Sequence, residues 1–261
     1  MPAHVPLLDL QHIRVMRGET IALDDFTLLI QHNEHVAILG PNGCGKSTLI
    51  KTITRECYPM IHEHSKISIL GRDRWNIFEL RSMLGIVSND LLAMCVGEAV
   101  GQDIVLSGFF SSTDIFPNHH VTPQQKALAA ATLARLGVAH LADRPVAEMS
   151  SGEAKRVLIA RALVHQPKAL LFDEPSNSLD IAAQQDLRQT MRSLANSGIG
   201  IILVTHELHD IIPEIDRVVL MAKGRLIADG PKEEVLTAER LSKLFGIPVE
   251  ISRRNGHYYL L

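Results

Sequence analysis

The chain has 261 residues, of which 26 are Lys or Arg and 29 are Asp or Glu, so its formal net charge is −3. Hydrophobic residues make up 46% of the sequence, which excludes a mainly disordered chain and allows one large domain or two small ones. The balanced charge argues against a dedicated nucleic-acid-binding protein, which usually carries an excess of basic residues.

The sequence has neither a predicted membrane span nor a predicted secretory signal. A membrane-spanning helix needs about 18 to 20 apolar residues, whereas the longest apolar run, at 199–205, is only as long as a strand. The first residues lack the basic region and the unbroken apolar region of a signal peptide. Three unpatterned cysteines, Cys44, Cys57 and Cys95, indicate a reduced chain. We therefore expect a cytoplasmic protein.

The first part of the chain predicts strands separated by turns. Segments 7–15 and 21–30 alternate apolar and polar residues, with a turn at 17–19 between them. The short apolar run at 35–39 is typical of a buried parallel strand. Further elements are predicted as a helix at 47–56 and as strands at 66–70 and 85–88.

The middle and last parts of the chain predict helices and then a regular alternation of strands and helices. From about 91 to 149 the sequence favours helices, although 107–123 is rich in turn formers and predicts a surface loop. The later alternation favours a parallel sheet covered by helices. The predicted elements are helices at 152–164 and 182–195, strands at 169–172 and 200–205, and a hairpin of 218–221 and 225–229.

A phosphate-binding loop is predicted between the strand at 35–39 and the helix that follows it. The pattern G-x4-G-K-[ST] is formed by Gly40, Pro41, Asn42, Gly43, Cys44, Gly45, Lys46 and Ser47. Glycines let the backbone wrap around phosphate oxygens, and the helix start adds inward N–H groups. Lys46 is expected to contact the β- and γ-phosphates, Ser47 to bind Mg²⁺ and Thr48 to reach the α-phosphate. The alternative is a glycine-rich turn without a ligand.

Cys44 within this loop has two interpretations. A thiol at a helix N-terminus favours the thiolate, which is typical of a redox-sensitive cysteine. The other interpretation is a small residue that the loop tolerates. We expect the second, and activity that is unchanged after peroxide treatment would exclude the first.

The strand at 169–172 ends in two carboxylates, Asp173 and Glu174. Beside a polyphosphate, Asp173 is expected to hold the Mg²⁺ shell and Glu174 to act as general base for the attacking water. His206, after the strand at 200–205, is predicted to contact the γ-phosphate or the water. His206 and His209 are three residues apart, whereas a zinc-protease helix needs two histidines four apart, so we reject that site.

Two further segments complete a pattern that identifies a family. Residues 149–153, Met-Ser-Ser-Gly-Glu, resemble the LSGGQ signature, and 178–180, Ser-Leu-Asp, resemble the D-loop. Together with the phosphate loop, the acidic strand end and His206, they make the chain resemble the nucleotide-binding subunit of an ATP-binding cassette (ABC) transporter over essentially its whole length.

The resemblance implies a fold. It is an α/β fold with a P-loop NTPase (RecA-like) core, a mostly parallel sheet, an antiparallel β subdomain and an inserted helical subdomain. We expect a single domain over 1–261, with the core formed by 1–90 and 151–261 and the helical subdomain at about 91–150.

The resemblance also implies a head-to-tail dimer, with a second copy of the chain or with a paralogous cassette, in which the signature of one subunit closes on the ATP of the other. Lys46, Glu174 and His206 are then the catalytic residues, and Ser47, Asp173 and Asn89 are the metal ligands. The residues expected to reach the partner's nucleotide are Ser150, Ser151, Gly152, Glu153 and Asp180. Free N–H groups at the start of the helix after Ser150 suit an anion, although an ordinary capped helix start is the alternative.

The sequence departs from the family pattern at three places. Asn89 or Asp90 stands where a glutamine is usual, so Asn89 is expected to reach Mg²⁺ only through water. The usual adenine-stacking aromatic is missing, and Met16 or Arg17 is expected to pack on the base instead. Glu153 replaces the signature glutamine, and we expect activity to survive that change.

Partners are implied by the resemblance alone. The stretch 224–250 resembles the tails of importer ATPases for iron chelates, cobalamin or molybdate. It implies a cytoplasmic subunit on the membrane's inner face, bound to an integral permease and working with a substrate-binding protein, with no nucleic acid as partner. Phe109 and Phe110 are candidate anchors for the permease, with local packing as the alternative.

The same motifs are compatible with two other functions. One is a soluble ABC-type ATPase acting as an assembly or repair factor without a membrane partner, and the other is a regulatory nucleotide binder without hydrolysis. The carboxylates Asp173 and Glu174 argue against the regulatory binder. His62 with His64, and His119 with His120, are candidate metal ligands, but we expect them in solvated loops.

Overall fold

The computed structural model describes residues 5–95 and 99–261, which fall into two compact units. The first unit joins Met1–Ile77 to Gly200–Leu261, and the second is Phe78–Ile199. Among the described residues, none of the helices combines the length and the apolar character needed to cross a membrane. The predicted subdomain boundaries near 91 and 150 stay a prediction.

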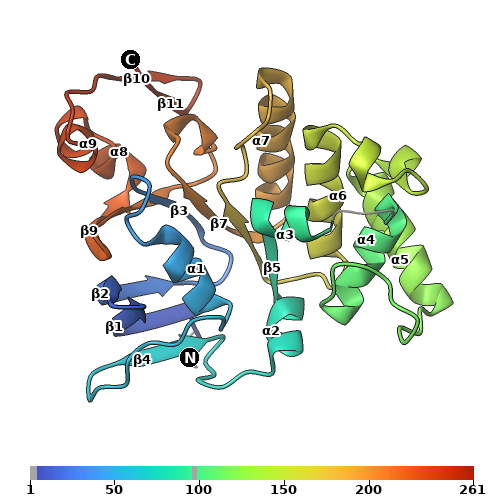
Figure 1. The fold of residues 1–261 in the computed structure, drawn as a ribbon. Helices are drawn as coiled ribbons and strands as arrows, with labels where there is room; N and C mark the ends of the chain where they lie inside the picture. Colours follow the sequence, from blue (N-terminus) through green and yellow to red (C-terminus); the bar gives the residue numbers. More distant parts are fainter. Residues whose placement is uncertain (1–4, 96–98) are drawn as a thin grey trace. The chain divides into compact units, whose positions relative to one another are not determined.

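The first unit contains an antiparallel sheet of three strands, β1 (Leu8–Arg17), β2 (Thr20–Ile30) and β4 (Lys66–Ile69). β1 lies in the middle and pairs with both neighbours (Figure 1). Alternate residues are buried along most of β1 and β2, as the period-two pattern predicted. The expected antiparallel β subdomain is therefore present.

The first unit also contains a mostly parallel group of strands. β3 (His35–Leu39) lies between β7 (Gly200–Thr205) and β8 (Arg217–Ala222) and is parallel to both. β9 (Arg225–Pro231) pairs with β8 in the predicted hairpin, whose turn has positive φ at Lys223 and Gly224. β7 is apolar and buried along its whole length, which is typical of a parallel strand covered on both faces.

Helices and a second hairpin complete the first unit. The phosphate loop connects β3 to α1. The end of the chain forms two helices and a hairpin that the sequence did not predict. These elements are α1 (Lys46–Ile53), the 3₁₀ turn Leu208–Asp210, α8 (Lys232–Val235), α9 (Ala238–Phe245), β10 (Ile251–Arg254) and β11 (His257–Leu260).

The second unit carries a pair of parallel strands, β5 (Leu84–Ser88) and β6 (Ala169–Asp173). Their register pairs Ser88 with Asp173, so the two strands end side by side. The remaining elements are α2 (Ile77–Met83), α3 (Asn89–Met94), α4 (Gly101–Ser107), α5 (Pro123–Arg135), α6 (Ser151–Leu163), α7 (Ile181–Asn196) and the 3₁₀ turns Gly108–Phe110, Ala139–Leu141 and Val146–Glu148.

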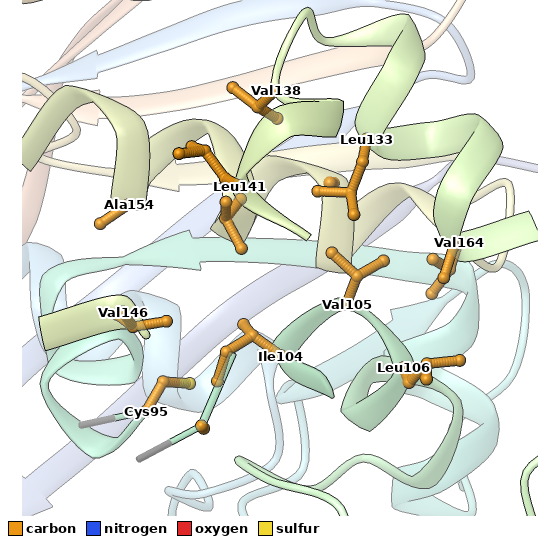
Figure 2. Close-up of a cluster of buried hydrophobic side chains, with 14 residues drawn as sticks. Cys95, Ile104, Val105, Leu106, Leu133, Val138, Leu141, Val146, Ala154 and Val164 are labelled. Carbon is orange, nitrogen blue, oxygen red and sulfur yellow. The ribbon is translucent and has the colours of Figure 1, made fainter. Parts of the chain in front are cut away.

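A separate hydrophobic cluster holds the helical part of the second unit together. α4, α5 and α6 pack against one another (Figure 1). Figure 2 shows Val105 of α4 and Leu133 of α5 pointing into one apolar cluster, with Leu141 beside them. These three side chains are fully buried. α4 and α5 lie in the part of the chain, from about 91 to 149, for which the sequence predicts helices.

Shortening Leu133 to alanine tests this cluster. Leu133 is 0% exposed, so Leu133→Ala removes buried methyl groups and leaves a cavity. We expect a loss of about 2 to 5 kcal/mol in the free energy of unfolding, measured by urea denaturation followed by circular dichroism. The control Gln124→Ala, at an exposed position of α5, should change it by less than about 0.5 kcal/mol. Equal effects of the two substitutions would contradict the assigned core.

The helix predicted at 47–56 is shorter in the structure. α1 ends at Ile53, because Arg55 adopts a left-handed backbone conformation (φ +62°) that no α-helix continues through. The Arg55 side chain is 8% exposed, and its Nη2 donates hydrogen bonds to the carbonyl oxygens of Ile67 and Asp73. A contact distant in sequence therefore ends this helix.

The segment 107–123 is only partly the surface loop that was predicted. Its first residues, Ser107 and Gly108, are buried, and Gly108–Phe110 forms a 3₁₀ turn. Arg161, in the last turn of α6, and His165, just after that helix, hold this start. Arg161 donates from Nε to Ser107 Oγ (3.1 Å) and from Nη2 to the Ser112 carbonyl (2.6 Å), and His165 Nε2 lies 3.0 Å from the Gly108 carbonyl.

Candidate functional site

The predicted site residues lie in both units. The first unit holds the phosphate loop, with Thr48, and His206. The second holds Asn89, Asp173, Glu174, the signature segment and Asp180.

The phosphate loop runs from the end of β3 into α1 with little space around its backbone. A Cβ at Gly40 would lie 2.3 Å from the Met221 carbonyl oxygen, and one at Gly45 would lie 2.5 Å from the Ala22 carbonyl oxygen. Gly45 also has φ +110°, which side chains disfavour, and it is the N-cap of α1. The two glycines of the pattern are thus required by the close approach of β8 and β2.

Lys46 is fixed by the loop itself. It is 5% exposed, and its Nζ donates hydrogen bonds to the carbonyl oxygens of Gly40 (2.8 Å) and Pro41 (3.2 Å). A buried ammonium with such partners is already oriented before a nucleotide arrives. Ser47 beside it is exposed, whereas Thr48 is buried.

The Cys44 side chain is buried against the start of the loop. It is 4% exposed, and its Sγ would lie 2.7 Å from a Cβ at Gly40. Its backbone carbonyl accepts a hydrogen bond from the Gly224 N–H (2.8 Å). This burial favours a small packing residue over an accessible redox thiol.

His206 lies at the same edge as the start of the phosphate loop. Leu39 of β3 pairs with Thr205 of β7, and the Gly40 N–H donates to the Thr205 carbonyl at 3.4 Å. The residues that directly follow the two parallel strands, Gly40 and His206, therefore emerge together, as the carboxyl ends of parallel strands do. His206 Nε2 lies 3.4 Å from Glu207 Oε1.

In the second unit, Asn89 and Glu174 are brought together by the register of β5 and β6. Each directly follows the end of its strand, and Asn89 Nδ2 donates a hydrogen bond to the Glu174 carbonyl oxygen (3.3 Å). Glu174 has a left-handed backbone (φ +43°), and its Oε2 accepts a hydrogen bond from Asn177 Nδ2 (2.7 Å). Asp90, the alternative to Asn89, is exposed on α3.

A buried lysine that the sequence analysis did not single out lies beside this group. Lys155 of α6 is 2% exposed, and its Nζ donates to Asn89 Oδ1 (2.5 Å). Burial lowers the pKa of Lys155 to about 8, while the nearby Asp173 carboxylate opposes that shift. The sequence offers little signal for it, because Lys155 and Arg156 stand side by side directly before the apolar run of α6 at 157–160.

The signature segment starts α6 with a reciprocal cap. Ser150 Oγ accepts from the Glu153 N–H (3.3 Å), and Glu153 Oε2 accepts from the Ser150 N–H (2.8 Å). The hydrogen bonds that the Ser150 N–H and the Ser150 hydroxyl donate to the Glu153 carboxylate lower the pKa of Glu153. Ser151 and Gly152 lie in the first turn of α6. Backbone N–H groups in a first turn have no carbonyl acceptor within the helix.

The D-loop and the signature lie beside one cavity. Ser150, Gly152 and Asp180 are among the residues that line this cavity of about 150 Å³. A Cβ at Gly152 would lie 2.9 Å from the Ala183 side chain, so the starts of α6 and α7 approach closely there. Asp180 caps α7, because its Oδ1 accepts from the Ala183 N–H (2.8 Å).

Met16 and Arg17, the expected contacts of the adenine ring, end β1. Met16 is 37% exposed, and Arg17 Nη1 lies 3.4 Å from Cys57 Sγ. Both side chains are accessible, and their contact with a base stays a prediction.

Met16 and Arg17, if they pack on the base, predict that the protein binds ATP only slightly more tightly than GTP. A thioether or a guanidinium packs on the face of either ring and does not read the ring edge that distinguishes adenine from guanine. We expect ATP to bind less than about a hundredfold more tightly than GTP, a difference below about 2.8 kcal/mol. Competition of each nucleotide against a fluorescent ATP analogue measures this, and a larger preference for ATP would contradict it.

The candidate permease anchors are packed locally. Phe109 contacts the helical cluster and meets the His165 ring edge to face, with ring centroids 5.1 Å apart. Phe110 stacks on His119, with centroids 4.3 Å apart. Phe116, in contrast, is 48% exposed. Local packing therefore accounts for both predicted anchors.

The candidate metal histidines have other contacts. His62 Nε2 lies 2.7 Å from the His12 carbonyl oxygen, and His119 is engaged by aromatic rings. Within residues 5–95 and 99–261, His, Cys, Asp and Glu side chains form no group of three or more arranged to hold a metal ion.

Comparison with known proteins decides the family. A family model described as ABC transporter matches residues 23–177, more than half of the chain. The chain belongs to the ABC transporter family. It is an ATP-binding domain of that family, and such domains are ATPases coupled to transport.

Similar proteins cover nearly the whole of this ABC ATPase. The hemin import ATP-binding protein HmuV of Bradyrhizobium diazoefficiens is 32% identical, over 98% of this chain and 94% of the relative. The uncharacterized ABC transporter ATP-binding protein YlmA of Bacillus subtilis is 30% identical, over 94% and 93%.

Solved structures confirm the predicted fold class of this ABC ATPase. CbiO1 from Clostridium perfringens, described as part of the ABC transporter complex CbiONQ, superposes with a TM-score of 0.76 at 28% identity, covering 91% of this chain and 93% of CbiO1. The ADP conformation of another ATP-binding cassette gives a TM-score of 0.79 at 25% identity, covering 92% and 97%. The α/β P-loop NTPase fold is thereby confirmed.

Proposed function

We propose that this chain is the ATP-hydrolysing subunit of a membrane importer and works as a head-to-tail dimer of two ATP-binding domains. The observation that carries the proposal is the cavity that Ser150, Gly152 and Asp180 line in the second unit. It lies at the N-terminus of α6, where unpaired N–H groups and the helix dipole favour an anion. We infer that the terminal phosphate of an ATP held by a second copy binds at this helix start.

In the proposed mechanism, the phosphate loop binds the nucleotide first. Its backbone N–H groups and the Lys46 ammonium bind the β- and γ-phosphates, and the loop is already shaped by its glycines. Lys46 then exchanges the Gly40 and Pro41 carbonyl oxygens for phosphate oxygens. Little reorganisation is needed, which lowers the free-energy cost of binding.

Mg²⁺ is the metal that this donor chemistry fits. Hydroxyl and carboxylate oxygens are its ligands in phosphate-loop proteins, and Ser47 is exposed at the start of α1 while Asp173 ends β6. Ser47 and Asp173 would hold the ion. When bound, Mg²⁺ supplies positive charge to the β- and γ-phosphate oxygens.

Hydrolysis is assigned to Glu174 and His206. The Glu174 carboxylate accepts a proton from the water that attacks the γ-phosphate, and Asn177 orients that carboxylate through its 2.7 Å hydrogen bond. His206, at the end of β7, positions the γ-phosphate or the water. Loss of the γ-phosphate then removes the anion that joins the two subunits, and the dimer opens.

An integral permease on the inner membrane face is the proposed partner, with a substrate-binding protein delivering the solute. The name of the 32% identical relative, a hemin import ATP-binding protein, supports an iron chelate such as hemin as cargo. The part of 107–123 that follows the start held by Arg161 and His165, where Phe116 is 48% exposed, is the proposed contact with the permease.

A pull-down from solubilised membranes tests the proposal. The tagged Glu174→Gln chain, incubated with ATP and Mg²⁺, is expected to recover a multi-spanning membrane protein and an equal amount of untagged chain. The Lys46→Met chain should recover far less untagged chain. Recovery of the ATPase without any membrane protein would overturn the transporter assignment and favour a soluble assembly or repair factor.

A further inference from the structure

We propose that Lys155 and Asn89 form a positioning pair that holds Glu174 in place for hydrolysis, and that Asn89 is therefore no magnesium ligand. The inference rests on the proposed role of Glu174 as general base. It replaces the prediction, made from the sequence, that Asn89 reaches Mg²⁺ through water. The three residues lie in the second unit, on α6, at the start of α3 and after β6.

Both polar ends of the Asn89 amide are engaged. Its Oδ1 accepts a hydrogen bond from Lys155 Nζ, and its Nδ2 donates one to the Glu174 carbonyl oxygen at 3.3 Å. A metal at Oδ1 would meet a positive charge on the same oxygen, in a site where Lys155 is buried and Asn89 is half-buried. Electrostatic repulsion between two such close cations disfavours that arrangement.

The fold places Lys155 for this contact. A Cβ at Gly85 of β5 would lie 2.8 Å from the Ala162 carbonyl and 3.1 Å from its Cβ, so α6 packs directly on the strand. Lys155 lies seven residues before Ala162, which is two helical turns along the same face. Asn89 follows β5 directly. The close approach at Gly85 thus brings the lysine to the end of the strand.

The backbone conformation of Glu174 needs stabilising contacts. Its φ of +43° is uncommon for a residue with a side chain, and such conformations persist only where the surroundings fix them. Asn89 fixes its carbonyl and Asn177 fixes its carboxylate. Lys155, by holding Asn89, completes a chain of hydrogen bonds from the signature helix to the proposed base.

Steady-state kinetics of Asn89→Ala, Lys155→Met and the double variant test the pair. Each single variant is expected to lower kcat about tenfold, while KM for ATP changes less than twofold. The double variant should lose no more than the worse single variant, because the two residues act in series. Lys155→Gln, whose amide can still donate to Asn89, should recover most of the rate. The control Lys168→Met, an exposed lysine before β6, should leave kcat unchanged. Additive losses, or a raised KM with unchanged kcat, would overturn the pair.

A binding measurement separates the pair from a metal ligand without relying on turnover. In the Glu174→Gln background, the Mg²⁺ dependence of binding of a fluorescent ATP analogue is measured with Asn89 intact and with Asn89→Ala. The Mg²⁺ midpoint should shift less than twofold, whereas Asp173→Asn should raise it about tenfold. A tenfold rise with Asn89→Ala would overturn the proposal. A wild-type chain that binds ATP but does not hydrolyse it would refute the proposed function, while this titration would still decide the role of Asn89.

Discussion

Glu174→Gln is expected to lower ATP turnover at least about a hundredfold while ATP binding stays intact, because a general base contributes typically 10² to 10⁴ in rate. The amide has the shape of the carboxylate but does not take up the proton of the attacking water. Its oxygen still accepts the hydrogen bond that Asn177 donates to Glu174. Phosphate release measures the turnover, and the binding of a fluorescent ATP analogue measures the affinity.

The same variant should also trap the dimer. With ATP bound and not hydrolysed, light scattering is expected to show a stable species of twice the monomer mass, which ADP does not produce. Glu148→Gln, at an exposed position of the turn before the signature, serves as the control and should hydrolyse ATP normally as a monomer–dimer mixture. Near-normal turnover of Glu174→Gln would show that another group is the base.

Lys46→Met is expected to weaken ATP binding at least about a hundredfold, or about 2.8 kcal/mol. The lost interactions are charge-assisted hydrogen bonds to phosphate oxygens, worth about 1.5 to 3 kcal/mol each. Lys46 is 5% exposed and its ammonium is held at the loop, so another side chain does not easily take its place. Isothermal titration with ATP and Mg²⁺ measures the change.

The matched control for this variant lies on the same helix. Lys51→Met removes a lysine from the last turn of α1 and should leave the affinity for ATP within twofold. Thermal unfolding of both variants shows whether α1 keeps its fold. Tight ATP binding by a folded Lys46→Met chain would contradict the assignment of the loop.

Local sequence patterns predicted the parallel strands well, for a physical reason. β3 and β7 have the bounds that were predicted, because a short apolar run ending in polar residues is typical of a strand buried on both faces. The phosphate loop was likewise readable, since its chemistry depends on residue types at fixed spacing. The end of α1 was not, because Arg55 bonds to carbonyl groups at 67 and 73.

The residues that the sequence did not reveal depend on strand register and helix packing. Asn89 and Glu174 are 85 residues apart in the chain, and their contact follows from Ser88 pairing with Asp173. In the sequence, nothing distinguishes Lys155 from the other charged residues near the start of α6. Its burial follows from the contact between α6 and Gly85, which periodicity does not predict.

One consequence concerns α6 as a mechanical element. The helix has 13 residues, so it is about 20 Å long. Ser150, at its start, lines the cavity with the D-loop, and Arg161 and His165, at its other end, grip the segment that begins at Ser107. A helix of this length behaves as a stiff rod. A rotation of its first turn during nucleotide exchange would therefore also move the segment that begins at Ser107.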